Sequence, residues 1–278
     1  MKINRYKVHT SGISETFSVM VISDSHDRYD ERWFDGLHPD MIAVVGDFIL
    51  GSNCDGRPDG ELWNARNKNA EKLLGKLRDI APVYLSIGNH EHRFKEWDIQ
   101  FIKGMGITVL DDEFLHIKNE VVIGGLTSGL SKSFRRLRDS YVREGKQFPK
   151  DWKYALYHQG LSDEELSIPD SGWLDDFENE DGFKILLSHH PEYWSLREPF
   201  LERKHIDLVL SGHAHGGQMR FFGQGIYAPG QGILPKYTKG RYDGDDGCMI
   251  VSAGMSNTYR IPRLFNPPEI VWVDVVPE

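Results

Sequence analysis

The sequence is poor in cysteine and has no long apolar run. Only Cys54 and Cys248 occur, far apart and without a Cys-x-x-Cys pair, which excludes a disulfide framework and a zinc ribbon. The longest apolar runs, such as 41–45, fall far short of the roughly 20 residues that cross a bilayer. The basic start, 1–7, continues into polar residues rather than into the apolar core of a signal peptide. We therefore expect no transmembrane segment and a cytoplasmic location, with peripheral attachment to a membrane left open.

Positive charge is also scarce. The 278 residues carry a formal net charge of -9 at pH 7. This balance argues against a broad surface for duplex nucleic acid or anionic membrane, although it allows a local basic patch. The basic cluster 135–138 is expected to be a solvated helix face. An apolar fraction of 39% and a charged fraction of 27% are typical of a soluble globular protein, and we expect a single domain over 1–278.

The sequence does contain apolar segments that each end in polar residues. Buried strands are expected at 17–23, 41–45, 83–87, 183–188 and 208–211. Because ligands bind outside the carboxyl ends of the strands in α/β sheets, the side chains that follow these strands should share one rim. These side chains are Asp24, His26, Asp47, Asn89, His189, His213 and His215. Packing alone does not explain them, since burying carboxylates and imidazoles without partners is costly.

The remaining segments complete an α/β pattern with at least a partly parallel sheet. Helices are expected at 61–80, where Pro82 ends the helix, and at 193–201, with a short amphipathic segment at 97–103 and weakly helical patches at 135–144 and 163–166. Further strands are expected at 107–110, 114–117, 121–123, 248–252 and 270–276. The Gly/Pro-rich stretch 223–247 is expected to be a long loop that faces the substrate or is locally mobile.

The seven donors at the strand ends have the chemistry of a metal site. They comprise carboxylates, imidazoles and one carboxamide without any thiolate, a set that favours Mn, Fe, Zn, Ni or Mg. Two carboxylates and four histidines exceed the four ligands of a structural zinc site. Two divalent metal ions that share a carboxylate are therefore expected. Such a pair stabilises both the attacking and the leaving oxygen of an in-line phosphoryl displacement.

Five motifs occur in a fixed order: Asp24-x-His26, Gly46-Asp47, Gly88-Asn89-His90-Glu91, His189 shortly before a proline, and Gly212-His213-x-His215. In this order they resemble the calcineurin-like metallophosphoesterase superfamily. The resemblance covers about residues 17 to 218, and it implies a four-layer α/β/β/α sandwich of two mixed β-sheets flanked by helices. The form GHxHGGQ at 212–218, together with 263–270, resembles the bacterial phosphodiesterase branch related to UDP-diacylglucosamine pyrophosphatases.

The resemblance also implies a role for each donor. One ion would be bound by Asp24, His26, Asp47 and His215, and the other by Asp47, Asn89, His189 and His213, so that Asp47 bridges them. His190 is the alternative to His189. Manganese or iron is favoured. A hydroxide that bridges the two ions would attack phosphorus in line, while His90, which is not a ligand, would act as the catalytic residue that protonates the leaving alkoxide.

The expected function is that of a dinuclear metal-dependent phosphohydrolase, a phosphodiesterase or pyrophosphatase for a small or lipid-linked substrate. The alternatives are a nuclease of the same superfamily and a non-catalytic metal-binding scaffold; the acidic net charge argues against extended nucleic acid as a substrate. The chain departs from many relatives in the stretch 48–51 after Asp47, where they place another acidic residue, and this puts the support of His90 in doubt. Arg263 is expected to be a surface charge.

Overall fold

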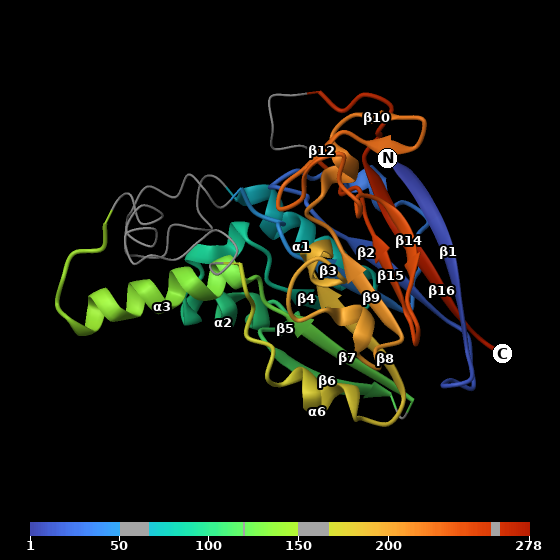
Figure 1. Ribbon diagram of the computed structural model, residues 1–278, viewed down its shortest axis with the longest axis horizontal. Coiled ribbons are helices and arrows are strands. Elements are labelled where there is room, and N and C mark those ends of the chain that lie inside the picture. The colour runs from blue at the N-terminus through green and yellow to red at the C-terminus, as the bar shows by residue number, and fades with distance from the viewer. Residues whose placement is uncertain (51–66, 119, 150–166, 257–261) are drawn as a thin grey trace.

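Two six-stranded sheets form the centre of the protein in the computed structural model, which describes residues 1–50, 67–118, 120–149, 167–256 and 262–278 (Figure 1). The order of the first sheet is β1-β16-β2-β3-β4-β5, and only the pairing of β16 with β2 is antiparallel. Its strands are β1 Lys2–Thr10, β16 Glu269–Pro277, β2 Phe17–Ile22, β3 Met41–Val45, β4 Val83–Ser86 and β5 Thr108–Leu110.

The second sheet has the order β14-β15-β9-β8-β7-β6, in which the two outer strands, β14 and β6, are antiparallel to their neighbours. Its strands are β14 Gly240–Asp243, β15 Cys248–Val251, β9 Leu208–Ser211, β8 Phe183–Ser188, β7 Val121–Leu126 and β6 Glu113–Lys118. Both sheets are mixed, as the sequence predicts.

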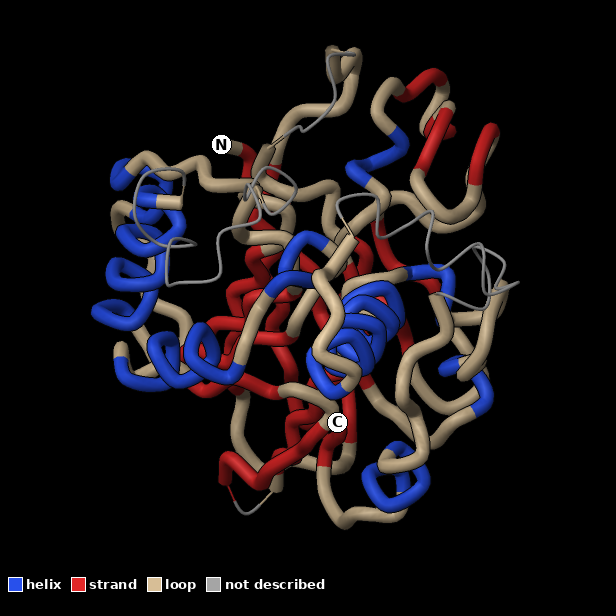
Figure 2. Tube along the Cα trace, turned by 90° about the vertical axis from the view of Figure 1, so that its left-hand side faces the viewer, coloured by secondary structure: helices blue, strands red, loops and turns tan. Residues whose placement is uncertain are grey.

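Both faces of the central strands are buried, which explains why these strands are continuous apolar runs. Successive side chains of a strand point to opposite faces. In β2, Val19 and Val21 pack in the layer between the two sheets, whereas Met20 and Ile22 pack on the outer face. Figure 2 shows the strands in the middle of the molecule with the helices outside them.

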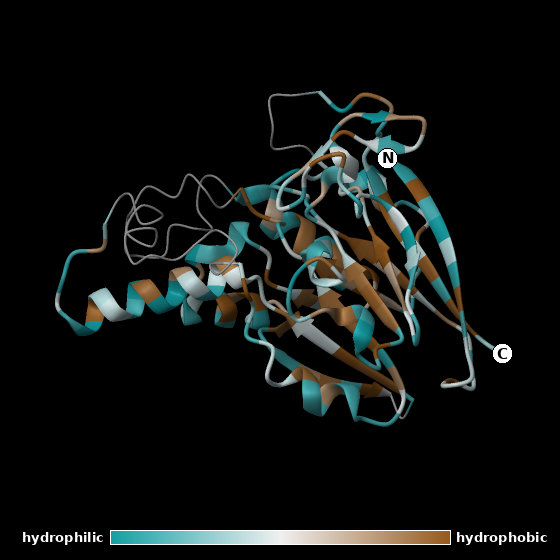
Figure 3. Ribbon diagram, in the orientation of Figure 1, coloured by the Kyte–Doolittle hydropathy of each residue, from teal (hydrophilic) through white to brown (hydrophobic). Residues whose placement is uncertain are grey.

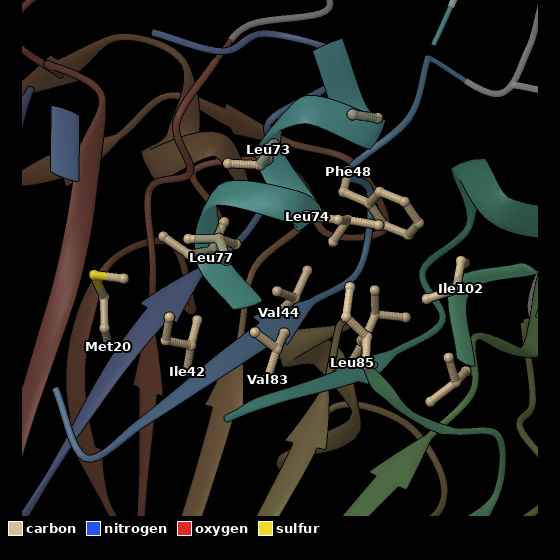
Figure 4. Close-up of a cluster of buried hydrophobic side chains, with 14 of the residues drawn as sticks. Met20, Ile42, Val44, Phe48, Leu73, Leu74, Leu77, Val83, Leu85 and Ile102 are labelled. Carbon is tan, nitrogen blue, oxygen red and sulfur yellow. The ribbon is translucent and has the colours of Figure 1, made fainter. Parts of the chain in front are cut away.

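Two helices cover the outer face of the first sheet. They are α1, Lys68–Ile80, and α2, Glu96–Gly104. Leu73, Leu74 and Leu77 of α1 are fully buried against apolar side chains of β3 and β4 (Figure 4). Their spacing places all three on one face of the helix, so the hydrophobic pattern of α1 determines which side of it faces the sheet.

The outer face of the second sheet is covered by shorter elements. They are α6, Leu174–Glu178, and the 3₁₀ turns η4, Pro191–Tyr193, and η5, Leu201–Arg203. Helix α3, Gly129–Arg143, extends away from the sheets (Figure 1) and forms a separate small apolar cluster with Phe148. The predicted arrangement of two mixed sheets flanked by helices is confirmed.

The remaining short elements are η1 Glu31–Phe34, η3 His90–Arg93, η6 His215–Gly217, β10 Arg220–Phe221, β11 Gln224–Gly225, β12 Tyr227–Ala228 and β13 Gly232–Ile233.

Several predicted elements differ from the structure. The helix expected at 193–201 is wrong: turns and the 3₁₀ segments η4 and η5 take its place, since Pro199 has no amide hydrogen for a helical bond. The stretch 223–247 is not one loop, because it contains the hairpin β12–β13 and the edge strand β14. Strand β1 was not predicted, and α3 begins before residue 135. Residues 61–66 and 163–166 lie outside the described residues.

Replacing Leu74 by alanine is expected to lower the free energy of unfolding by about 2–5 kcal/mol, because it leaves a cavity between α1 and the first sheet. Urea denaturation followed by circular dichroism measures the change. The matched control is Val142→Ala in α3, where the side chain is 72% exposed and a change within about 0.5 kcal/mol is expected. An equal effect of the two substitutions would contradict the packing described for α1.

Candidate metal centre

The rim predicted from the five strand ends is present, but two sheets build it. Strands β2, β3 and β4 of the first sheet and β8 and β9 of the second end beside one another. Backbone hydrogen bonds join their ends within each sheet, from Asp24 N to Gly46 O at 3.2 Å and from Gly212 N to His189 O at 3.0 Å. Side chains join the two sheets, since His189 Nδ1 lies 2.8 Å from the carbonyl oxygen of Val45.

The predicted donors gather in neighbouring groups. Asp24, His26 and His215 each offer a ligand atom within 4.8 Å of the others, and Asp47, His189 and His213 do the same. A further group consists of His26, Asp47 and His90, and it links the first two. Asn89 directly precedes His90, whose backbone N–H donates to Asp47 Oδ1 at 2.8 Å. The donors that the sequence predicts therefore surround one small volume.

Some of the buried donor atoms have no partner among the described residues. His26 Nε2 and Asn89 Oδ1 are buried and make no hydrogen bond there. A buried polar atom without a partner costs about 1–3 kcal/mol. These atoms point to a cation as their missing partner, because an imidazole nitrogen and a carboxamide oxygen are both good ligands of divalent metals.

Burial and mutual charge determine how the donors ionise. Burial, reinforced by nearby histidines, holds the pKa of His26 and of His213 well below the ordinary value. Burial likewise lowers the pKa of His215, against the opposing charge of Asp24. These imidazoles are therefore neutral at pH 7. A neutral imidazole keeps the lone pair that a metal ion requires.

Asp47 and His189 form a buried ion pair, with Asp47 Oδ2 3.1 Å from His189 Nε2. Burial disfavours both charges, but the charge of Asp47 outweighs it and raises the pKa of His189 to about 10. In the same way, the charges of His189 and His90 outweigh burial and hold the pKa of Asp47 well below its usual range. The negative charge of Asp47 therefore stabilises a positive charge at the position of His189 Nε2.

Much of the rim backbone has positive φ values, a conformation that residues other than glycine rarely adopt. Asp24, His26, Asp47, His213 and His215 have φ values of 50°, 45°, 53°, 63° and 47°. Such conformations persist only where the surrounding structure enforces them, and they cluster at functional sites. Glycine is required beside them, because a Cβ on Gly212 would lie 2.6 Å from Asp24 Oδ2.

Glu91 supports the centre in a way that the sequence did not reveal. Its fully buried carboxylate accepts hydrogen bonds from the backbone N–H groups of Asp47 and Gly88, both at 2.9 Å, and of Phe48 at 3.0 Å. Burial, with the charge of Asp47, raises the pKa of Glu91 to about 7. Only its place in the motif Gly88–Glu91 could have indicated this role. Glu91 fixes the loop after β3 to the loop after β4.

His90 is supported by a backbone carbonyl group in the stretch 48–51, where the sequence has no acidic residue. His90 Nδ1 lies 3.0 Å from the carbonyl oxygen of Leu50, and Nε2 lies 3.8 Å from Asp47 Oδ2. The side chain of His90 is 22% exposed, whereas His26 and His189 are buried. His90 therefore faces both the donor groups and the solvent.

His190, the alternative donor, points elsewhere. Its Nε2 lies 2.7 Å from Ser128 Oγ, and it belongs to a buried group with Glu192 that shares His213 with the group of Asp47 and His189. Burial and the neighbouring charge of His189 lower the pKa of His190 to about 3. The geometry favours His189 over His190 as the residue that faces Asp47.

Arg263 is not the surface charge that the sequence suggested. Its guanidinium lies 3.0 Å from His215 Nδ1, and it donates to the carbonyl oxygen of Ser256. Burial lowers the pKa of Arg263 to about 10, so it stays protonated. Asn266 donates to the carbonyl oxygen of His215 at 2.7 Å. The segment that precedes β16 thus holds the loop after β9 in place.

The comparisons with known proteins agree with this geometry. Residues 17–217 match the family model of the calcineurin-like phosphoesterases, and the chain belongs to this family. It is 26% identical to an uncharacterized metallophosphoesterase of Aquifex aeolicus over 99% of this chain and 92% of that protein. It is 24% identical to the metallophosphoesterase YkoQ of Bacillus subtilis over 84% of this chain and 71% of that protein.

Among solved structures, the sulfate thiohydrolase of Thermus thermophilus is similar with a TM-score of 0.41 and 13% identity, over 77% of this chain and 34% of that one. Within the described ranges, no helix combines the length and the apolar character that crossing a membrane requires.

Replacing Glu91 by glutamine is expected to lower the free energy of unfolding by about 1–3 kcal/mol, because the new amide group turns a donor towards backbone N–H groups that need an acceptor. Thermal and urea denaturation measure the loss. Glu113→Gln is the control, since Glu113 is 53% exposed and only pairs with Lys103 at 3.8 Å. If both variants were as stable as the unaltered protein, the support assigned to Glu91 would be wrong.

Proposed function

We propose that the centre binds two divalent metal ions and that the protein hydrolyses phosphodiesters or pyrophosphates. The observation that carries the proposal is the pair of adjacent buried groups, each with one aspartate and two histidines, at the carboxyl ends of strands from both sheets. The orphaned atoms His26 Nε2 and Asn89 Oδ1 support it. The shared core between the sheets supports treating 1–278 as one domain.

The neighbouring groups of donor residues indicate which residues would bind each ion. Asp24, His26 and His215 would hold one ion, and His189, His213 and Asn89 the other. Asp47 would bridge, because it belongs to a group with His26 as well as to a group with His189 and His213. Divalent ions supply Lewis acidity towards a phosphate ester and towards water. Carboxylate, imidazole and carboxamide donors without thiolate suit manganese or iron, and also zinc, nickel or magnesium.

The chain's own residues position the substrate and move the proton. Glu91 holds the backbone of Asp47 at 2.9 Å, so the bridging carboxylate has a fixed orientation. The carbonyl oxygen of Leu50 accepts from His90 Nδ1–H, which leaves Nε2 as the ring nitrogen that faces the centre. In this role His90 would transfer its Nε2 proton to the leaving alkoxide, a contribution of about 10²- to 10⁴-fold in rate.

Purified protein with Mn²⁺ is expected to hydrolyse bis(p-nitrophenyl) phosphate, to lose this activity on chelation with EDTA and to regain it when Mn²⁺ is added back. Asp47→Ala is expected to be inactive, because it removes the carboxylate that both groups share. Asp139→Ala, on the exposed face of α3, is the control and should keep full activity. Equal rates for the two variants would refute the proposal. Cleavage of single-stranded DNA in place of the diester would favour the nuclease alternative.

His90→Gln and His213→Ala separate catalysis from metal binding. His90→Gln is expected to retain the metal content of the unaltered protein while kcat falls by about 10²- to 10⁴-fold. His213→Ala is expected to lose about one ion per chain, because it removes a ligand. Inductively coupled plasma mass spectrometry of the dialysed proteins, beside the diesterase assay, tests both. Loss of metal from His90→Gln would make His90 a ligand and remove its proposed role.

A further inference from the structure

Six large apolar side chains are exposed together beside the metal centre, and we call them the apolar edge. Their exposed fractions are 44% for Phe221, 110% for Phe222, 79% for Ile233, 64% for Leu234, 44% for Leu264 and 78% for Phe265. Isolated exposed apolar side chains are ordinary. A contiguous group of this size on a protein surface marks an interaction site.

The apolar edge is one surface although three segments of the chain contribute to it. The rings of Phe221 and Phe265 lie 5.8 Å apart, and Arg220 N donates to Leu264 O at 3.0 Å. Leu234 N donates to Ile226 O at 2.9 Å, and Ile226 N donates in turn to Met219 O at 3.0 Å. Figures 1 and 3 show these loops around β10 and β12 at the top of the molecule, with hydrophobic stretches in them.

Neither the backbone conformation nor the packing of the fold requires large apolar side chains at these positions. Phe222, Leu234 and Phe265 have φ values of 49°, 52° and 54°, in the left-handed region where glycine and asparagine are favoured. Phe222 is fully exposed and so contributes no packing. Large apolar residues therefore occupy turn positions that other residues would fill at lower cost, and strain of this kind is typical of functional segments.

The two segments of the chain that contain the apolar edge differ in charge from the chain as a whole. Neither 208–242 nor 247–268 contains an aspartate or glutamate, although the chain holds 42 of these residues and has a net charge of -9. The same segments contain basic residues. Lys236 is exposed, with Nζ 4.7 Å from the centre of the Tyr237 ring. Lys236 therefore places an exposed positive charge in a segment that contains no acidic residue.

We infer that the apolar edge is a membrane-docking surface, which inserts into the headgroup region of a bilayer that contains anionic phospholipid. Exposed aromatic and aliphatic side chains beside basic residues are the features that place a protein in a membrane interface. The lack of acidic residues in 208–242 and 247–268 suits the negative surface potential of such a bilayer. The positive charge of Lys236 and the lack of acidic residues in these segments favour an anionic bilayer over a protein partner as the occupant.

The position of this surface also indicates the class of substrate. Asn266, which follows Phe265, donates to the carbonyl oxygen of His215 at 2.7 Å, and β11 and β12 pack on η6. A docked bilayer would therefore lie next to the centre. If the proposed function holds, the phosphoester in a lipid headgroup is the substrate that this arrangement reaches; the docking surface itself does not depend on that function.

Co-sedimentation with vesicles of equimolar phosphatidylcholine and phosphatidylglycerol tests the inference. The unaltered protein should bind, and Phe222→Asn and Phe265→Asn should each weaken binding on the order of tenfold, as expected for one aromatic side chain withdrawn from the interface. Lys236→Gln should weaken binding to these vesicles about fivefold and leave binding to pure phosphatidylcholine unchanged. Val142→Asn, an exposed apolar side chain on α3, is the control and should bind as the unaltered protein does.

Asparagine suits the left-handed backbone at 222 and 265, so these variants should fold. Thermal unfolding measures whether their stability matches that of the unaltered protein. Failure of the unaltered protein to bind vesicles, or binding that Phe222→Asn and Phe265→Asn leave intact, would overturn the inference. So would sedimentation velocity that shows a dimer dissociated by Phe222→Asn, without vesicle binding. Hydrolysis of bis(p-nitrophenyl) phosphate, measured in parallel, should be unchanged in Phe222→Asn. Vesicle binding without hydrolysis would leave the docking surface in place and refute only the proposed function.

Discussion

The ion pair between Asp47 and His189 joins the two halves of the protein. Asp47 follows β3 in the first sheet, and His189 follows β8 in the second; their side chains meet at 3.1 Å, both buried. The other ring nitrogen of His189 lies 2.8 Å from the carbonyl oxygen of Val45. Removing one member of a buried pair leaves an uncompensated charge. The candidate centre and the alignment of the two sheets therefore depend on the same contact.

The strained rim is stable because a rigid core lies directly beneath it. Val19 and Val21 of β2 belong to the same buried apolar cluster as Ile185 and Leu187 of β8, in the layer between the sheets, and close packing of this kind has low compressibility. At the rim, Glu91 adds hydrogen bonds to backbone groups of two loops. Left-handed backbone at Asp24 and His213 is thereby maintained, and donors from distant parts of the chain keep fixed positions.

Negative charge is buried in the candidate centre, whereas the two neighbouring segments of the chain contain no acidic residue. The buried carboxylates of Asp24 and Asp47 attract cations into the rim, and burial keeps His26 and His213 neutral. Immediately outside, the segments after β9 and before β16 contain no acidic residue, which suits the anionic substrate and lipid surface proposed for this protein. The overall net charge of -9 averages these opposite regions and reveals neither.

The sequence by itself determined the strands and the identity of the donors, because alternation, apolar runs and the residues that follow a strand are local properties. Strand β3 and the strand-end histidines were predictable in this way, whereas the solvated edge strand β1 lacks an apolar run and was missed. Only the tertiary structure decided that two sheets share the rim, that Glu91 supports Asp47, and that Phe222 and Phe265 lie on one surface. These features rest on contacts such as that between His189 and Val45, 144 residues apart, and no local pattern encodes such a contact.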